Sequence, residues 1–488
     1  MEGGSKAWAN TRFRLGSPWV RQFACAVLLA VFLGLAVIRV PALLILAAIA
    51  GVLAVFLAYT RPEAMILVLI GLTTELIPAR FNPYLRLGGR GLFASDLMIL
   101  LLFGVFAFRL LADRGFTLRR TPLNLPMLFF AGAVGLGMFT ALKAGTAFSF
   151  ATQDARIFLY YTAFFVVINL IRTKQQLLWL TKGLLFAGGA VAVTMTIQAL
   201  LGQGAGLVDQ SQLFTETTTA GSVVRFYAMG TVAAYVTFMV ALATLALEGE
   251  GKWRALAVCL LLITGASVVL TLDRNLLIST SISVLVLLFL ARRLGWSRLG
   301  FNLLLVLAVG FAGLLVLAAT GLQDRLLAYI PAFSARLASL FGGAVLAPTE
   351  TLGWRLQELH FAWPILQQHP LTGVGLDTNY RPAFFFGDTL ESYTENAYVG
   401  LWLKTGLPGL LAFSWFSIAF LVRGFRNWQK IPDRFLRATT LGFTLAFLAL
   451  AASDIVTPFF IINWSMLVLP VTFGINELTY RLAMDSTA

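Results

Sequence analysis

One polar stretch of this chain gathers residue types that can carry acid–base chemistry. Residues 351–385, TLGWRLQELHFAWPILQQHPLTGVGLDTNYRPAFF, contain both histidines of the protein, His360 and His369. Glu395 follows shortly after, in SYTENAYVGLWLKTG. A carboxylate or an imidazole within hydrogen-bond reach can take the proton of a hydroxyl nucleophile. Glu395, His360 and His369 are therefore the candidate catalytic bases, although structural roles for the histidines and a helix-starting role for Glu395 are also open.

Two arginines lie where polar sequence meets apolar sequence, and both are suited to hold a phosphate group. Arg225 lies in GSVVRFYAMGTVAAYV, where we expect it to open a helix. Arg274 lies in VVLTLDRNLLISTS, where a polar triplet interrupts an otherwise apolar run and predicts a tight turn at the membrane surface. A guanidinium group donates two parallel hydrogen bonds and stays charged. Simple snorkelling of these side chains toward lipid headgroups is the alternative.

The segment after Glu395 places polar residues along one predicted helix. Asn396 and Lys404 are eight residues apart and so share one stripe of a helix, with Lys404 roughly 12 Å deeper. A charged side chain at that depth suggests function, so both residues are candidates for substrate binding. A structural ion pair between Lys404 and a carboxylate such as Asp454 is the alternative.

The composition defines the class of protein that must position these residues. Of 488 residues, 59% are hydrophobic and only 12% are charged, which predicts an integral membrane protein. The net charge of +14 is spread over short loops between apolar runs, which argues against a nucleic-acid partner. Cys25 and Cys259 lie inside apolar runs, so neither a disulfide framework nor a zinc site is expected. We expect no metal and no cofactor.

Apolar runs of bilayer length predict an all-α polytopic fold with about 14 transmembrane helices, or 12 to 14 given the short runs near the amino terminus. The first run follows basic residues but has no cleavage motif, so we expect a retained span. The predicted spans lie near residues 20–38, 41–60, 64–78, 93–112, 123–142, 155–171, 178–201, 225–247, 254–272, 275–291, 300–319, 397–422, 436–453 and 457–477.

The distribution of lysine and arginine predicts the orientation. Most of the 36 basic residues fall in alternate loops, which makes those loops and both termini cytoplasmic and places residues 320–395 in one long periplasmic loop. Arg381 belongs to the basic residues on the predicted outer side, which an anionic ligand would explain. The full set is Arg39, Arg80, Arg86, Arg90, Lys143, Arg156, Arg225, Arg274, Arg325, Arg336, Arg355, Arg381 and Lys404.

The long loop is expected to contain a short amphipathic helix over residues 354–368, lying on the membrane surface beside the mouth of the bundle. The motif HPLTGVGLDTNY after it predicts a chain reversal at Pro370, Gly373 and Gly375. We divide the chain into amino-terminal spans (1–224), spans carrying the phosphate-binding arginines (225–319), the loop (320–395) and carboxy-terminal spans (396–488).

The order of these motifs resembles that of the O-antigen ligase and polymerase superfamily of the bacterial envelope. The resemblance covers roughly residues 225–413, from Arg225 through Arg274 and HPLTGVG to ENAYVGLWLKTGLPGLL. It implies a metal-independent membrane glycosyltransferase of the type C architecture. Such proteins transfer a glycan from an undecaprenyl diphosphate carrier to an acceptor sugar, here a glycan or lipid-linked acceptor, at the periplasmic face of the inner membrane.

By similarity, Arg225 and Arg274 would hold the donor diphosphate, with Arg355 assisting. The family usually carries His-Asn where this chain has Glu395-Asn396, so the base is either Glu395 or one of the two histidines. The resemblance does not separate a polymerase from a ligase. A transporter, for example of inorganic carbon or another anion, is the main alternative, and a flippase of the lipid-linked sugar is another.

Overall fold

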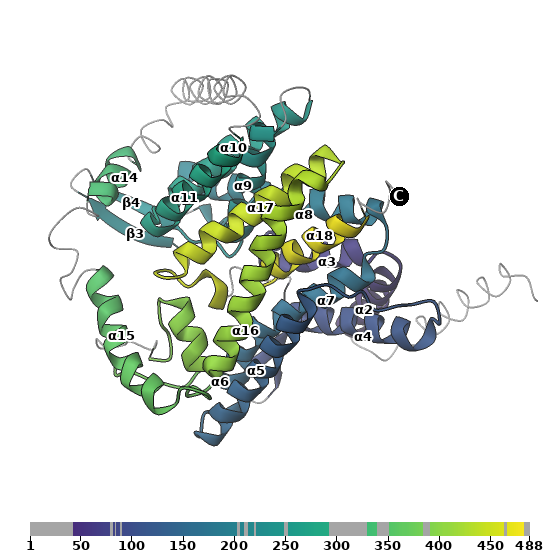
Figure 1. Cartoon of the computed structure of the whole chain (residues 1–488), viewed down its shortest axis with the longest axis horizontal. Coiled ribbons are helices and arrows are strands. Elements are labelled where there is room, and N and C mark those ends of the chain that lie inside the picture. Colours follow the sequence, from purple (N-terminus) through teal and green to yellow (C-terminus); the bar gives the residue numbers. More distant parts are fainter. Residues whose placement is uncertain are drawn as a thin grey trace, which may run out of the picture. The chain divides into compact units, whose positions relative to one another are not determined.

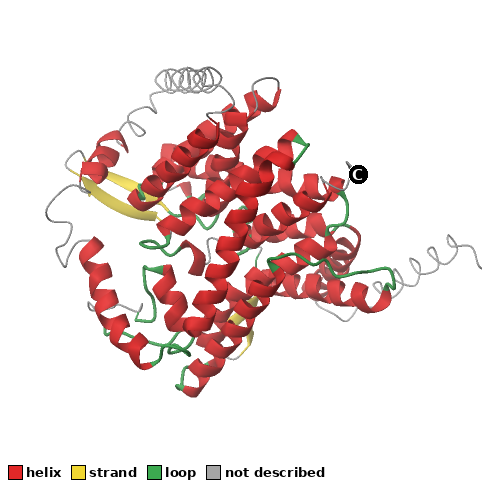
Figure 2. Ribbon diagram, viewed as in Figure 1, coloured by secondary structure: helices red, strands yellow, loops and turns green. Residues whose placement is uncertain are grey.

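Helices make up most of the regular structure in the computed structural model, and two short antiparallel hairpins supply the strands (Figures 1 and 2). The structure describes residues 42–78, 82, 84–87, 90–202, 205–208, 213–218, 221–247, 252–291, 329–338, 351–383, 391–462 and 466–482. It forms two compact units, residues 1–61 and 62–488. The four-part division made from the sequence remains a prediction.

The helices follow one another along the chain with few strands between them (Figure 1). The α-helices are α2 (Ala42–Thr60), α3 (Pro62–Thr73), α4 (Ala94–Ala112), α5 (Asn124–Lys143), α6 (Phe148–Leu159), α7 (Ala163–Leu170), α8 (Lys174–Leu201), α9 (Thr231–Leu247), α10 (Lys252–Leu270), α11 (Arg274–Ala291), α14 (Tyr329–Ala338), α15 (Thr351–Gln368), α16 (Ala397–Asn427), α17 (Arg434–Ser453) and α18 (Val468–Leu482). The 3-10 turns are η2 (Tyr160–Thr162), η7 (Trp428–Lys430) and η8 (Phe459–Ile461), and the hairpins pair β1 (Tyr84–Leu87) with β2 (Arg90–Phe93) and β3 (Leu213–Thr218) with β4 (Gly221–Phe226).

These elements make the protein a mainly helical, multi-pass membrane protein. Within the described ranges, α4, α5, α8, α17 and the continuous segment Ala397–Lys430 are long and apolar enough to cross a bilayer. Shorter apolar helices lie at Ile49–Thr60, Pro62–Thr73, Thr231–Leu247, Arg254–Leu270 and Arg274–Leu290. The spans expected at 20–38 and 300–319 lie outside the described residues, and the total of about 14 remains a prediction.

In three places a predicted span does not correspond to a single helix. The run at 155–171 is divided into α6, η2 and α7, and the run at 457–477 starts with η8 before α18 continues to Leu482. The expectation that Arg225 opens a helix is wrong, because Arg225 lies in β4, paired with Phe214 of β3. The sequence LFTETT–GSVVRF is rich in threonine and valine, which favour extended backbone, and α9 begins only at Thr231.

The HPLTGVG motif packs backbone to backbone against a kink in α16. Gly406 has a left-handed φ of +69° inside α16, two residues before Pro408, and Gly373 has a φ of +63°. A Cβ atom on Gly373 would overlap the carbonyl oxygen of Leu403, and one on Gly406 would overlap that of Leu371. Only glycine allows both the conformation and the approach, so the motif fixes the turn after α15 against α16.

Aromatic side chains hold the carboxy-terminal helices together. Phe473 of α18 lies 4.8 Å from Phe416, 4.7 Å from Phe420 and 5.2 Å from Phe447, measured between ring centroids, and all three pairs are edge-to-face. Each of these rings is buried. The cluster joins α16, α17 and α18 into one packed group.

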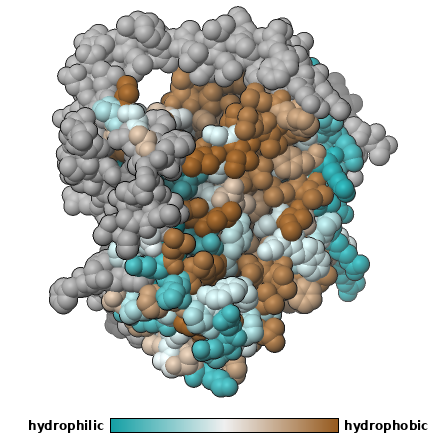
Figure 3. All heavy atoms as spheres, turned by 60° about the vertical axis from the view of Figure 1, so that its left-hand side comes forward, coloured by the Kyte–Doolittle hydropathy of each residue, from teal (hydrophilic) through white to brown (hydrophobic). Residues whose placement is uncertain are grey.

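Much of the outer surface is apolar. Figure 3 shows hydrophobic side chains over a wide area of one face. On α16, Leu411, Trp415 and Ile418 are exposed although they are large and hydrophobic. Such a surface is suited to lipid rather than to water.

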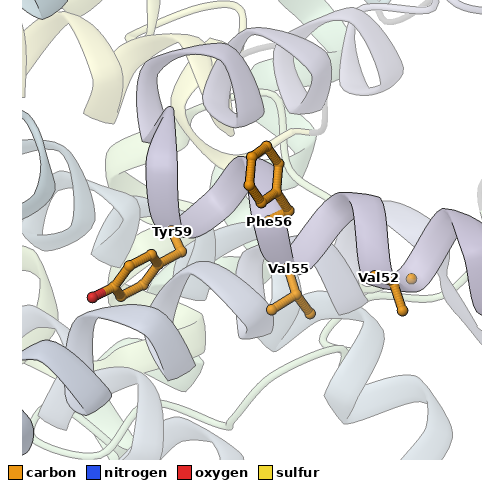
Figure 4. A pocket seen from close by; sticks show the side chains of 5 residues that line it. Val52, Val55, Phe56 and Tyr59 are labelled. Atoms are coloured by element: carbon orange, nitrogen blue, oxygen red, sulfur yellow. The ribbon is translucent and has the colours of Figure 1, made fainter. Parts of the chain in front are cut away.

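A hollow of about 640 Å³ beside α2 lies on the same kind of surface (Figure 4). Its lining comes from that one helix, namely Gly51, Val52, Val55, Phe56 and Tyr59. The phenol of Tyr59 is the one side-chain group among these five that could donate a proton or accept a hydrogen bond. The hollow therefore offers a place for apolar chains and no catalytic group.

Candidate active site

Two glutamates meet at the start of α16. Glu395 directly precedes the helix cap, and its backbone N–H donates a 2.9 Å hydrogen bond to Oε2 of Glu358 on α15. The hydroxyl of Thr394 donates to the same oxygen at 3.3 Å. Glu358 is only 6% exposed, whereas the side chain of Glu395 is 36% exposed. The pair therefore has an inner member that holds the segment and an outer member that a substrate can reach.

Arg355 joins α15 to both sides of this site. Its guanidinium forms an ion pair with the Glu395 carboxylate, and its Nε donates a 2.8 Å hydrogen bond to the carbonyl oxygen of Val456, in the loop between α17 and η8. Arg355 lies one helical turn before Glu358, so both side chains face the start of α16 from the same side of α15. The outward stripe of α15 is apolar, with Leu356, Leu359 and Trp363 exposed.

Arg225 approaches the same carboxylate from the β3–β4 hairpin. Its Nε donates to the carbonyl oxygen of Thr271 at 3.2 Å, and its guanidinium also bonds the Tyr227 hydroxyl and lies 5.0 Å from that ring. These contacts fix the direction of the group. Both Arg225 and Asp273 act electrostatically on Glu395, so the hairpin, the α10–α11 turn and the start of α16 converge.

The turn that carries Arg274 is tied to the loop that Arg355 contacts. Asp273 caps α11 by accepting a 2.9 Å hydrogen bond from the N–H of Asn275, and the Asn275 amide donates to the hydroxyl of Thr457 at 2.9 Å. Arg274 is the first residue of α11 and is half-buried. The predicted tight turn is confirmed, and it brings Arg274 to the end of the bundle where Glu395 lies.

Burial changes the acidity of both glutamates. It raises the pKa of Glu358 from 4.5 to about 7, although the hydrogen bond from the Glu395 backbone opposes the change. Burial also raises the pKa of Glu395, while the neighbouring Arg355 lowers it. The net direction of the Glu395 pKa is upward, which makes its carboxylate a stronger base than a free one, and Glu358 can hold a proton near neutral pH.

The raised pKa of Glu358 predicts a pH-dependent stability. The folded state keeps the Glu358 proton to about pH 7 and the unfolded state loses it near 4.5, so the free energy of unfolding should fall by at most ~3 kcal/mol as pH rises through that window. Glu358→Gln should flatten this dependence in thermal unfolding of the purified protein. Asp113→Asn, at an exposed loop carboxylate, is the matched control, and an equal flattening in both variants would contradict the assignment.

Arg381 lies on the inner side of the glutamate pair. It is only 8% exposed, and it acts electrostatically on Glu358 and on Tyr380. The Tyr380 hydroxyl donates a 3.0 Å hydrogen bond to the carbonyl oxygen of Tyr393. Arg381 therefore lies behind Glu358 rather than at the open side of the site.

Two predicted substrate-binding residues have structural partners instead. The side chain of Asn396 caps α16 by accepting 3.0 Å hydrogen bonds from the N–H groups of Tyr398 and Val399. Lys404 forms a buried ion pair of 2.8 Å with Asp154 of α6. The alternative of a structural ion pair between Lys404 and a carboxylate is confirmed, but the carboxylate is Asp154 and not the suggested Asp454. Asp454 accepts instead from the Phe460 N–H, and its carbonyl oxygen receives the Ala397 N–H. That Asn396 and Lys404 bind substrate remains a prediction.

The histidines lie away from the glutamate pair. His360 and His369 are both exposed, and His360 packs its ring 5.8 Å from that of Phe361. Their places on α15 and just after it agree with the expected helix and turn. Over the part of the chain that the structure describes, no group of three or more His, Cys, Asp or Glu side chains is placed to bind a metal ion.

Sequence reasoning missed Glu358 as a member of the site. The residue lies within the amphipathic helix expected over residues 354–368 and was given no role there. A carboxylate opposite an exposed apolar stripe is the signal that could have located it, because that stripe faces lipid and the opposite face must then turn inward. Asp154 gave no such signal.

The arrangement defines a multi-pass helical membrane protein with a charged site at the amino-terminal end of the long helix α16. Residues 256–414 match the family model Wzy_C, described as O-antigen ligase. This part of the chain is therefore similar to the O-antigen ligase family, which agrees with the resemblance seen in the order of its motifs. No curated protein matches the chain. The matched segment contains Arg274, Arg355, Glu358 and Glu395, while Arg225 precedes it.

Proposed function

We propose that the protein is a glycosyltransferase that moves a glycan from an undecaprenyl diphosphate donor to a sugar hydroxyl at the periplasmic face of a bacterial inner membrane. The O-antigen ligase family match supports a glycosyl-transferring role with lipid-linked substrates. The observation that carries the proposal is the junction of Arg355 and Glu395 at the start of α16, with Arg225 acting on the same carboxylate. Both termini are cytoplasmic in this proposal.

The arginines would stabilise the leaving group. A lipid diphosphate departs with its negative charge when the bond between the anomeric carbon and the phosphate oxygen breaks, and preorganised cations lower the energy of that charge. Arg225 is held by Thr271 and Tyr227, so its guanidinium is already oriented before a donor binds. Arg274 approaches from the neighbouring turn. We propose that these two residues bind the diphosphate. Arg355 would lie between the diphosphate and the proposed base, Glu395.

Glu395 would activate the acceptor. Its carboxylate takes the proton of the acceptor hydroxyl while the oxygen of that hydroxyl bonds to the anomeric carbon. A single displacement of this kind inverts the anomeric configuration. Glu358 does not contact the acceptor in this mechanism, because its carboxylate is buried and engaged with Thr394 and the Glu395 backbone. Its role is to position Glu395.

Reconstituted transfer tests the assignment of the arginines. We expect Arg225→Gln and Arg274→Gln each to lower transfer from an undecaprenyl-diphosphate-linked glycan by about 100-fold. In cells, the lipid-linked precursor should accumulate. Arg114→Gln, at an exposed arginine of the loop between α4 and α5, is the control and should keep full activity.

The same variants separate the proposed enzyme from a transporter. If both variants lose uptake of a solute while precursor and product levels stay at those of the unmodified protein, the glycosyltransferase proposal fails. The acceptor used in the reconstituted reaction also distinguishes a polymerase from a ligase, since the two share the donor chemistry and differ in the acceptor.

A further inference from the structure

An arginine-rich cavity lies at the other end of α16 from the candidate active site. It has a volume of about 580 Å³. Its lining comes from the loop before α5 and from the last turns of α16 and α18, namely Leu118, Arg120, Thr121, Pro122, Arg423, Asn427, Glu477, Tyr480 and Arg481. Arg423 follows Asn396 by 27 positions, almost all of them helical, so even with the kink at Gly406 the two sites lie at opposite ends of α16, at most about 40 Å apart.

The charges in this cavity are not balanced. Arg423 forms a two-point ion pair with Glu477, at 2.7 and 2.9 Å. Arg120 and Arg481 are exposed, and neither has an ion pair with any residue that the structure describes. Three arginines thus face one carboxylate. Burial lowers the pKa of the nearby Arg172 guanidinium, as do Arg109 and Arg481, while Asp113 opposes the change.

Tyr480 supplies an independent sign of a missing partner. The side chain is 7% exposed and lines the cavity, and its hydroxyl has no hydrogen-bond partner within the described part of the chain. The guanidinium of Arg423 lies 5.3 Å from the Tyr480 ring. A buried hydroxyl without a partner costs free energy, so an acceptor atom bound in the cavity would satisfy it.

A separate apolar groove lies along α5, with Pro408 of α16 in its lining. It has a volume of about 400 Å³ and is lined by Leu125, Leu128, Phe129, Gly132, Ala133, Leu136 and Pro408. Leu125 is the second residue of α5 and follows Thr121 of the cavity by four positions. A polar cavity at the helix ends and an apolar groove along the helices match the two parts of a phospholipid.

We propose that the cavity binds the phosphate of an anionic phospholipid, with Arg120 and Arg481 as charge partners, the Tyr480 hydroxyl as a hydrogen-bond donor and a lipid chain in the groove. On the predicted orientation, the lipid belongs to the cytoplasmic leaflet. The site is independent of the glycan-transfer chemistry. Because its arginines come from the loop before α5 and from α18, an occupied site would also hold α5, α16 and α18 together at this end.

Lipid retention by the purified protein tests the proposal. Native mass spectrometry with phosphatidylglycerol and phosphatidylcholine should show a preference of about tenfold or more for the anionic lipid. The double variant Arg120→Gln/Arg481→Gln should lose this preference. The double variant Arg114→Gln/Arg426→Gln removes the same charge from exposed positions outside the lining and should keep it.

Two further measurements fix the ligand and the role of the hydroxyl. Tyr480→Phe removes one oxygen atom and should weaken retention of phosphatidylglycerol severalfold without lowering thermal stability in detergent. Inorganic phosphate in excess should not displace the lipid. An equal loss of the lipid preference in both double variants would show that general surface charge causes it. Displacement of the lipid by inorganic phosphate would show that the cavity binds a soluble anion. Either result overturns the proposal.

Discussion

Glu395→Gln is expected to lower kcat for glycan transfer by about 100-fold to 10,000-fold, with little change in KM for the donor. Glutamine keeps the size and can still accept a hydrogen bond, but it cannot take the proton of the acceptor hydroxyl. The ion pair with Arg355 is lost as well, although the Arg355 bond to the Val456 carbonyl remains. Initial rates with reconstituted protein and lipid-linked donor measure the effect.

The two histidines supply the control for this prediction. His360→Ala and His369→Ala should keep most of the activity, because both side chains are exposed and neither contacts Glu395 or Glu358 among the described residues. Glu358→Gln should lower the rate less than Glu395→Gln, since glutamine still accepts the Glu395 N–H. A large loss in either histidine variant, with Glu395→Gln active, would move the base to that histidine.

Lys404→Met is expected to destabilise the fold by about 3 to 5 kcal/mol, because it leaves Asp154 buried and without its cation. The other Asp154 oxygen accepts the Asp377 N–H at 2.9 Å, so the pair also anchors the loop that leads toward the glutamates. Thermal unfolding of the purified protein in one detergent, over a series of temperatures, measures the loss.

A double variant separates a structural role from a binding role. Lys404→Met/Asp154→Asn removes both charges and keeps an acceptor for Asp377, so it should recover most of the lost stability. Transfer activity should recover with it. A Lys404→Met protein of normal stability with a raised KM for the donor would instead restore the original prediction that Lys404 binds substrate.

Sequence patterns predicted the helices well where a long apolar run sets the length. The ends of α4, α5, α11 and α17 lie within two residues of the predicted spans. The β3–β4 hairpin was missed because its valine and threonine residues merge with the apolar run of α9. An apolar pattern shows that a segment is buried or in lipid, but it does not separate a short strand from the first turns of a helix.

The site was predicted in part, and the missing part depends on contacts between distant segments. Glu395 and Arg355 were both candidates, but nothing in their spacing showed that they bond each other. The Lys404 partner lies 250 positions earlier in the sequence, on α6, and just before the span predicted at 155–171. The distribution of lysine and arginine predicts on which side of the membrane a residue lies. It does not predict which residues lie next to each other, so it could not place Asp154 beside Lys404.

The anchored turn after α15 limits how this helix can move. The HPLTGVG backbone packs on α16 at Gly373 and Gly406, so the carboxy-terminal end of α15 is anchored there. Pro364 lacks a backbone N–H and offers a hinge within α15. A bulky acceptor would then enter by swinging the amino-terminal half outward about that hinge. Arg355 would then hold the closed position, because the return of the amino-terminal half of α15 restores the bonds of Arg355 to Glu395 and Val456 once the sugar is bound.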